Sequence, residues 1–379
     1  MGSYPTTQFS PKSSETRRPY PKRGKVAVFH GQGEPFELIE REVPPLKAGQ
    51  VLVEILFTTL CRSDVNTYRG KRVEKTPTIL GHEIVGRMIA TAEDTPLVDS
   101  AGAIVNPGDR MTWAIFGSDP EDPMSLRGMP QKAANLFKYG HEVITEESNW
   151  HGGLAEFCIL RPGTPFLRLK EETPLEVASL INCAGATAAG AIRTAGVCRD
   201  RRVLISGAGM LGLFAVAMIS QEGPRELVAF DLNGERLSKS KQFGADTTIE
   251  DIQEITEPFD VIIDFTGASS AIASALEKLA IGGRCVLIGS THPDTPISIQ
   301  PEKLVRSLQS ISGLHNYNAE DFKTAVHFME THHARFPFRE LVQAKFTLDE
   351  VNEAFAAAMG PAYRIGIYTN KNDAEKQKE

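Results

Sequence analysis

The sequence predicts a two-domain α/β protein, with a β-rich part followed by a doubly wound parallel sheet. The chain has 379 residues, more than one hydrophobic core usually organises. From Lys25 to about Leu160 the apolar stretches are short, rich in strand formers and separated by Gly, Pro and Asp. After about Thr173, compact apolar stretches alternate with helical runs. This alternation is typical of βαβ units around a parallel sheet.

In the first part, the predicted strands include KVAVFH, VLVEILF and AEFCIL. Residues 117–150 lie between them with many loop formers and no sustained period. We expect a long excursion there with one short helix.

In the second part, the predicted strands are RVLISGA, ELVAFD, DVIIDFTG and RCVLIGS. From about Asn318 the chain has an amphipathic stretch, LDEVNEAFAAAM, then a strand-like YRIGIYT and a charged end. We therefore expect a flexible tail over residues 1–22, one domain built from residues 23–185 and 319–379, and a second domain over residues 186–318.

The composition is that of an ordinary globular protein, with 41% hydrophobic residues, 23% charged residues and a formal net charge of -7. No basic stripe is visible, which argues against a nucleic-acid partner. The five cysteines are odd in number and scattered, so they predict a reducing compartment rather than a disulfide framework.

No targeting signal or membrane-spanning segment is evident in the sequence. The first two dozen residues contain no apolar core for a secretory signal, and no apolar run reaches the roughly 18 to 20 residues that span a bilayer. We predict a cytoplasmic protein. A basic, Ser-containing tail also suits an organelle address, against which Glu15 and the prolines count.

A glycine-rich turn indicates a dinucleotide site. Gly207, Gly209 and Gly212 form GAGMLG between the apolar stretch RVLIS and a helical run. The first Gly permits the tight turn, the second lets the backbone approach a pyrophosphate, and the third lets helix pack on strand. Asp231 ends the next strand, where a carboxylate accepts from the ribose hydroxyls and repels a 2'-phosphate, favouring NAD over NADP.

Two alternatives apply to this turn. The glycines alone suit a turn without ligand, in which Asp231 caps the following helix. Arg236, a few residues past Asp231, suits either a phosphate contact or a solvated helix position.

Cys61 in CRSD, His82 in GHE and Cys183 in NCAGAT form a thiolate, imidazole and thiolate set suited to zinc. Three protein ligands leave a fourth position open for substrate or water. Each cysteine taken singly is more typical of core filling.

The motifs CRSD, PTILGHEIVG, GDR at residues 108–110, GGLAEF, NCAGAT, GAGMLG and YRIGIY occur in an order that resembles medium-chain zinc-dependent alcohol dehydrogenases. The resemblance covers about Lys25 to Thr369. It implies a GroES-like catalytic domain, a Rossmann-type domain, a homodimer or homotetramer, and hydride transfer between a small alcohol or its carbonyl partner and NAD.

The resemblance also implies residue roles. Cys61, His82 and Cys183 would be the catalytic zinc ligands, with Glu83 close enough to assist ligand exchange. Asp64 would orient His82, and the Ser63 hydroxyl would bond the substrate oxygen and pass its proton outward. Thr187 matches a position behind the nicotinamide ring. Arg62 and Arg364 match positions that meet the pyrophosphate.

The sequence departs from this family in two places. Asn66 stands where many relatives end their proton relay in a histidine, and an amide does not titrate. Asp119, Asp122, Ser125 and Ala133 stand where many relatives carry four cysteines for a structural zinc. Two aspartates, a serine and an alanine are a poor zinc set, so we expect one metal ion per chain.

Other candidates receive ordinary roles. A second GHE contains His141, which we interpret as a loop or pocket-rim residue. His315 in GLHNY is a core or surface residue within reach of substrate contact, and Cys158, Cys198 and Cys285 are core residues.

The runs RGMPQK, KYGHE, GAGMLG and GLHNY are similar to a subgroup described as phosphonate-catabolism-associated alcohol dehydrogenases. That similarity implies a small, phosphonate-related aldehyde or alcohol. Two other functions stay open: a zinc-free enone or quinone reductase of the same superfamily, and a noncatalytic NAD-binding protein.

Overall fold

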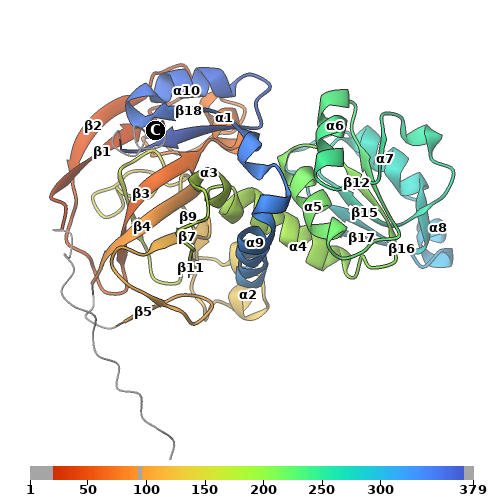
Figure 1. The fold of residues 1–379 in the computed structure, drawn as a ribbon, viewed down its shortest axis with the longest axis horizontal. Helices are drawn as coiled ribbons and strands as arrows, with labels where there is room; N and C mark the ends of the chain where they lie inside the picture. Colours follow the sequence, from red (N-terminus) through yellow and green to blue (C-terminus); the bar gives the residue numbers. More distant parts are fainter. Residues whose placement is uncertain (1–19, 93–95, 371–379) are drawn as a thin grey trace, which may run out of the picture.

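The computed structural model describes residues 20–92 and 96–370. Its ribbon has two parts side by side, one built from the first and last segments of the chain and one from the segment between them (Figure 1). Of the tail expected at residues 1–22, residues 1–19 lie outside the described residues, as does the charged end from residue 371.

The β-rich part is built on a seven-stranded sheet, in which six strands follow the order β11-β7-β4-β3-β19-β18 and β10 pairs with β3. The bounds are β3 Val51–Thr59, β4 Glu83–Thr91, β7 Arg110–Trp113, β10 Phe157–Leu160, β11 Phe166–Arg168, β18 Val342–Thr347 and β19 Arg364–Tyr368. The C-terminal strand β19 lies antiparallel to β3. The last segment of the chain thereby completes a sheet that the first segment begins.

Three small two-stranded sheets surround this one. They pair β1 (Arg23–Val28) with β2 (Glu37–Glu42), β5 (Leu97–Val98) with β6 (Ile104–Val105), and β8 (Phe116–Gly117) with β9 (Phe137–Lys138). Helices of the β-rich part include α1 (Arg62–Tyr68), α2 (Pro123–Leu126) and α10 (Val351–Ala358).

The excursion at residues 117–150 holds more structure than the single short helix expected. It contains α2, the 3₁₀ turn η1 (Pro130–Lys132) and the pair β8–β9. Short pieces of this kind leave no periodic signal in the sequence, which is why the pattern predicted a loop.

The second part is a six-stranded, all-parallel sheet in the order β14-β13-β12-β15-β16-β17. Its strands are β12 Arg202–Ser206, β13 Glu226–Phe230, β14 Thr247–Ile249, β15 Phe259–Asp264, β16 Leu279–Leu287 and β17 Ser310–Gly313. The connecting helices are α5 Met210–Ser220, α6 Gly234–Gln242, α7 Ser269–Glu277 and α8 Pro301–Arg306.

Both faces of this sheet are buried, as the doubly wound prediction requires. Val203 and Ile205 of β12 point into one hydrophobic cluster, and Leu204 between them points into another. Successive side chains of a strand point to opposite faces, so a strand with cores on both sides is apolar throughout. The chain order reverses between β12 and β15, the place where such sheets bind ligands.

One helical stretch among the described residues, Leu175–Ala195, is long and apolar enough to span a membrane. The sequence pattern predicted no such run. It arises because α3 (Leu175–Ala178), a π-helical turn (Ile181–Gly185, η2) and α4 (Ala186–Ala195) follow one another closely. Its most apolar window is 94% buried, and it packs in a cluster that also contains Phe57 of β3 and Val203 of β12. The stretch therefore joins the two parts through their common core, beside α9 (Ala319–His332).

Candidate functional site

Cys61, His82, Glu83 and Cys183 form a compact group at the junction of the two parts. One potential ligand atom from each lies within 4.8 Å of all the others. The Cys61 and Cys183 sulfur atoms are 4.0 Å apart. Two sulfurs on one tetrahedral zinc ion lie about 3.8 Å apart, given Zn–S bonds of about 2.3 Å. The donor set and its spacing therefore fit zinc.

Strand pairing explains why these residues meet. Thr59 at the end of β3 lies opposite Glu83 at the start of β4. Cys61 is the second residue after β3 and His82 directly precedes β4, so antiparallel register brings both to the same end of the sheet. Cys183 lies in the π-helical turn, which packs against β4. Such turns widen a helix locally and are frequent at functional sites.

Asp64 fixes the orientation of His82 from behind. Its Oδ1 atom lies 3.2 Å from His82 Nδ1, while its Oδ2 accepts from the Cys61 backbone N–H at 2.9 Å. Burial opposes the charged form of His82, but the Asp64 carboxylate outweighs it and raises the pKa of the imidazole well above its ordinary value. The other ring nitrogen, Nε2, is 3.4 Å from the Ser63 hydroxyl. This nitrogen is the one available to a metal ion.

The two cysteines differ in acidity. The hydrogen bond from Cys183 is the main cause that lowers the pKa of Cys61 well below its ordinary value, and the positive charge of Arg364 adds to it. The same contact with Cys61 and burial raise the pKa of Cys183. A thiolate is the form of cysteine that binds metal ions.

Arg364 lies beside the metal-ligand group and pairs with Glu83. Its Nε and Nη2 atoms donate to the two carboxylate oxygens of Glu83 at 2.6 and 2.7 Å, and its Nη1 donates to the Tyr363 carbonyl at 2.8 Å. Only 4% of the residue is exposed. The bidentate pairing holds Arg364 behind the metal ligands, with Nη2 3.6 Å from the Cys61 sulfur.

The glycine turn has the shape that a dinucleotide site needs. Gly207 has a φ of +100°, a conformation that favours glycine. A Cβ on Gly212 would lie 1.9 Å from the Gly207 carbonyl oxygen, so only glycine lets α5 start this close to β12. A Cβ on Gly209 would meet nothing within 4 Å. Gly209 precedes α5 without a side-chain cap, which leaves open N–H groups for an anion.

Asp231 follows β13 and turns toward this glycine loop. Its Oδ2 accepts from the Ala208 backbone N–H at 2.8 Å, and its Oδ1 accepts from the Asn233 N–H at 3.0 Å. The next helix, α6, is capped by Asn233 instead. The alternative in which Asp231 caps that helix is therefore not what the structure shows. Arg236 lies 3.7 Å from Asp231 and is exposed.

Two further expected residues face the same region. Thr187 lies one helical turn after Cys183, with 9% of its surface exposed. Arg62 is the first residue of α1 and is exposed. Partial burial, followed by the positive charges of Arg364 and Arg236, lowers the pKa of Arg62. The charge of Arg236 in the parallel-sheet part therefore affects the pKa of Arg62 in the β-rich part.

His141 lies deeper in the site than the sequence suggested. Its ring centroid is 5.0 Å from that of His82, and its Nδ1 lies 3.1 Å from Glu74, which pairs with Arg72 at 2.7 Å. Glu74 and Arg72 were not predicted. The repeated GHE was the available signal, but only the close approach of Gly140 to Gly81 brings His141 beside the first motif.

In the excursion, two hydrogen bonds to Asp122 join segments that are separate in the sequence. Asp122 Oδ1 accepts from the Met124 N–H at 2.7 Å, and Oδ2 accepts from the Ala134 N–H at 3.0 Å. The same carboxylate therefore ties α2 to the residue that follows Ala133. Ala133 itself is buried.

The remaining cysteines lie in the core. Burial raises the pKa of Cys198 and of Cys285 to about 12, and it raises that of Cys158 still further. These thiols are neutral near pH 7 and act as apolar side chains.

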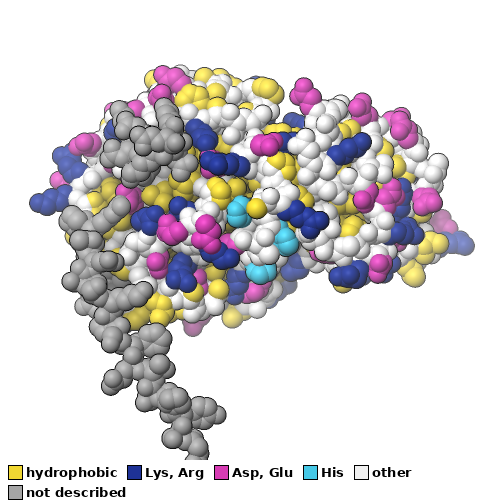
Figure 2. All heavy atoms as spheres, in the orientation of Figure 1, with side chains coloured by type: hydrophobic (Ala, Val, Ile, Leu, Met, Phe, Trp, Pro, Cys, Tyr) yellow, Lys and Arg dark blue, Asp and Glu magenta, His cyan; other side chains and the backbone are white. Residues whose placement is uncertain are grey.

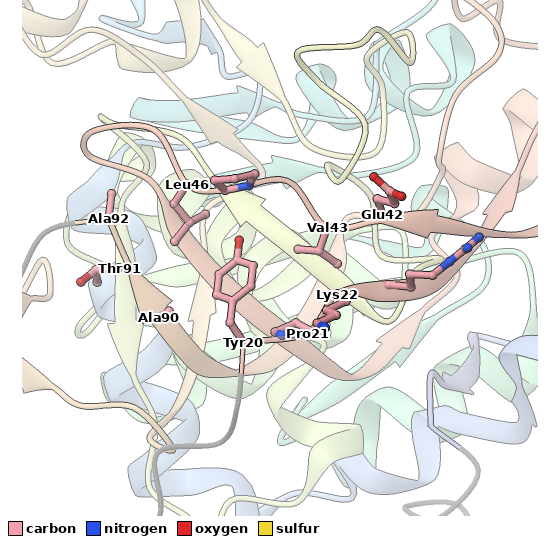
Figure 3. A pocket seen from close by; sticks show the side chains of 11 residues that line it. Tyr20, Pro21, Lys22, Glu42, Val43, Leu46, Ala90, Thr91 and Ala92 are labelled. Atoms are coloured by element: carbon pink, nitrogen blue, oxygen red, sulfur yellow. The ribbon is translucent and has the colours of Figure 1, made fainter.

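A groove of about 670 Å³ lies elsewhere, between Tyr20, Val43 and Leu46 and the end of β4 at Ala90 (Figure 3). None of its lining residues belongs to the metal-ligand group or to the glycine turn. It has no part in this site.

Comparison with known proteins agrees with this geometry. Residues 47–168 match the alcohol dehydrogenase GroES-like domain, and residues 211–331 match the zinc-binding dehydrogenase family. The 5-exo-hydroxycamphor dehydrogenase of Pseudomonas putida is 27% identical over 88% of this chain and 94% of its own. An alcohol dehydrogenase of Geobacillus stearothermophilus is 29% identical over 87% of this chain and 94% of its own.

Among solved structures, an alcohol dehydrogenase from Thermotoga maritima superposes with a TM-score of 0.85 at 26% identity, covering 91% of this chain and 99% of its own. The chain belongs to the medium-chain zinc-dependent alcohol dehydrogenase family. Its fold is the GroES-like domain and Rossmann-type domain of that family, and its relatives are oxidoreductases that act on CH–OH groups.

Proposed function

We propose that this protein is an NAD-linked alcohol dehydrogenase with one catalytic zinc ion per chain. The observation that supports this proposal is the group formed by Cys61, His82 and Cys183. Their ligand atoms are spaced as a zinc ion requires, and the group lies at the junction with the sheet that bears the glycine turn. A zinc-free reductase would not require two cysteines and a histidine placed to bind a metal ion.

In this proposal Cys61, His82 and Cys183 hold the metal ion, and Asp64 keeps His82 in the tautomer that presents Nε2. Bound zinc lowers the pKa of the substrate hydroxyl, and bound nicotinamide accepts the hydride. Glu83 is held by Arg364 at the back of the ligand group, where it assists ligand exchange.

The Ser63 hydroxyl takes the proton of the substrate oxygen. It lies 3.4 Å from Nε2 of His82, the nitrogen that would bind the metal ion, and so within reach of a substrate oxygen at that site. Asn66 cannot titrate, so the proton would pass from Ser63 to water or to a hydroxyl of the bound cofactor. Thr187 would support the nicotinamide ring, and Arg62 and Arg364 together with the amides after Gly209 would meet the pyrophosphate.

Asp231 accepts from the adenosine ribose and favours NAD over NADP. Each of its oxygens already accepts one backbone N–H, and a carboxylate oxygen accepts more than one donor. The carboxylate is thus both fixed in place and still able to bind the ribose.

The substrate is a small alcohol or its aldehyde or ketone partner, and the subgroup resemblance extends this to a phosphonate-related compound. We also propose that the protein is a cytoplasmic homodimer or homotetramer, and that nucleic acid and membranes are not among its partners.

The test is elemental analysis of the purified protein together with a panel of alcohols and aldehydes assayed with NAD and NADP. We expect one zinc ion per chain and turnover that is faster with NAD. Stoichiometric zinc without turnover of any panel member would favour a noncatalytic NAD-binding protein. Turnover of enones with NADPH and no bound zinc would favour the reductase.

A further inference from the structure

Two lysines near the metal-ligand group form no ion pair with a carboxylate within 4.0 Å among the described residues. Lys138 ends β9 and is partly buried, and the nearest acidic residues, Glu74 and Glu142, act on it only at longer range. Burial, and then the positive charges of Arg72 and Lys132, lower the pKa of Lys138 and outweigh the opposing effect of these two carboxylates. A partly desolvated ammonium without a partner is costly unless an anion joins it.

The second lysine contacts a neutral histidine instead of an acid. Lys132 Nζ lies 2.8 Å from His315 Nδ1. Burial, followed by the charges of Lys132, Lys138 and Arg72, lowers the pKa of His315 to about 4. At neutral pH the imidazole therefore accepts from the ammonium through Nδ1 and carries its own proton on Nε2, as a further donor. The contact leaves the positive charge of Lys132 uncompensated.

These groups adjoin the metal-ligand group through a short segment of backbone. His141 follows Lys138 by three residues and packs its ring against His82. Gly140 lies against Gly81, the residue before His82, so closely that a Cβ on Gly140 would come within 2.5 Å of the Gly81 carbonyl oxygen. The charge of Arg72 in the same region is balanced by Glu74.

The three donors come from different parts of the fold. Lys132 and Lys138 belong to the excursion of the β-rich part, while His315 lies in the segment that returns from β17 to α9. Asn318 in that segment also donates to the Gly128 carbonyl. Figure 2 shows histidine side chains gathered near the middle of the face, with Lys and Arg side chains beside them.

We propose that Lys132, Lys138 and His315 form a subsite that binds an anionic oxygen group on the substrate, a phosphonate, phosphate or carboxylate carried by the small alcohol or aldehyde. This proposal rests on the proposed function, because it assigns the far end of a molecule whose reacting oxygen is at the metal-ligand group. Two ammonium groups and one N–H offer point-charge recognition of such an oxyanion. A cationic substrate would be repelled.

The experiment compares the wild type with the double variant K132Q/K138Q, using zinc-loaded full-length protein. The matched control is K303Q/K323Q, which removes the same charge from two lysines that pair locally on α8 and α9. Substrates of similar length separate the chemistry: 3-hydroxypropylphosphonate, 4-hydroxybutyrate and 1-butanol. Binding of methylphosphonate, acetate and NAD is measured by calorimetry, independently of turnover.

We expect the wild type to prefer at least one anionic alcohol over 1-butanol in kcat/KM. In K132Q/K138Q this preference falls by about tenfold or more, because charge-assisted hydrogen bonds are lost. Methylphosphonate or acetate binding falls in parallel, NAD affinity is kept, and the control behaves as the wild type. If only 3-hydroxypropylphosphonate is preferred over 1-butanol, the subsite requires a doubly charged group. If 4-hydroxybutyrate is preferred as well, the subsite accepts a carboxylate as well as a phosphonate.

The subsite is overturned if anionic and neutral alcohols react equally in the wild type, or if the double variant and the control change alike. Loss of NAD affinity in K132Q/K138Q would overturn it too, since the lysines would then serve the nucleotide. If no alcohol reacts, the proposed function fails, and lysine-dependent binding of methylphosphonate or acetate still decides whether the anion site exists.

Discussion

Asp64 shows how one buried carboxylate organises the metal-ligand group. It accepts from the backbone of Cys61 and lies against His82 Nδ1, so it links the end of β3 to the start of β4. The residue is fully buried. Its neighbours are the Cys61 backbone N–H and the imidazole of His82, whose pKa the Asp64 carboxylate helps to raise. The ligands are therefore held in place by the protein itself.

Ser63 is the residue at which proton transfer can be tested. We expect Ser63→Ala to lower kcat by about 10² to 10⁴, because one positioned proton-transfer group is lost. NAD affinity should change little, as Ser63 lies beside His82 and away from the glycine turn. Steady-state kinetics and NADH fluorescence titration measure the two quantities. Ser63→Thr keeps a hydroxyl and serves as control; full turnover of the alanine variant would mean that the proton leaves by another route.

Asp231 is the residue at which cofactor choice can be tested. Asp231→Ser should lower the ratio of kcat/KM for NAD over NADP by roughly tenfold or more, since a hydrogen bond to a charged group contributes about 1.5 to 3 kcal/mol. Arg236 at 3.7 Å becomes free to meet the 2'-phosphate. Asp231→Asn keeps an acceptor for the Ala208 N–H without the charge and separates the two contributions. A wild type that prefers NADP would show that the ribose is read by another group.

At the scale of elements, one carboxylate links two parts of the excursion at residues 117–150. Asp122 accepts from the Met124 and Ala134 N–H groups through its two oxygens. Backbone hydrogen bonds from Ala134 and Met124 lower the pKa of this carboxyl, so it is ionised throughout the neutral range. Hydrogen bonds to a charged side chain thus join α2 to the residue that follows Ala133.

We expect Asp122→Ala to loosen this segment without abolishing the fold. Amide hydrogen exchange of Met124 and Ala134 should become faster, because each loses its acceptor, while exchange in β12 and β15 stays slow. Asp119→Ala is the matched control, since Asp119 accepts only from the nearby Glu121 N–H. Unchanged exchange at Ala134, or recovery of slow exchange on adding zinc, would contradict this account.

At the scale of the whole molecule, the metal-ligand group lies between large hydrophobic cores that do not depend on it. One cluster contains residues of both parts, including Phe57 and Val203, and a second fills the β-rich part around Trp113 and Phe355. We therefore expect gentle chelation to remove zinc and activity while the circular dichroism spectrum of the folded protein is kept. Thermal unfolding should stay cooperative, with a lower Tm because the stabilisation from bound zinc is lost. Global unfolding on chelation would indicate a structural metal ion. Cys183→Ala should behave as the chelated protein does.

The parallel sheet ends at β17, and apolar side chains lie exposed near this edge. Ile281, Val305 and Leu308 are 81%, 72% and 75% exposed. An unpaired edge with apolar neighbours favours association with a second copy. We expect light scattering to give a dimer or tetramer, and Val305→Glu to shift it toward monomer. Leu126→Glu, at an equally exposed site on α2 of the β-rich part, should leave the mass unchanged. A monomeric wild type would contradict the proposed assembly.

The sequence alone predicted the two kinds of sheet, because buried parallel strands and half-buried antiparallel strands carry different apolar patterns. It also identified the glycine turn, since Gly207 and Gly212 meet local steric demands that only glycine satisfies. The motifs around Cys61, His82 and Cys183 named the ligand group through a resemblance, and the structure brings these residues together.

Tertiary structure decided what depends on contacts between distant segments. Arg364 pairs with Glu83, 281 residues away along the chain, which no local pattern encodes. His141 reaches His82 only because two glycines let their backbones approach closely. Lys132 and His315 meet across 183 residues. Local residue preferences act over a few positions, whereas charge pairing and packing act through space, so the elements followed from the sequence and the partners of the charged groups followed from the fold.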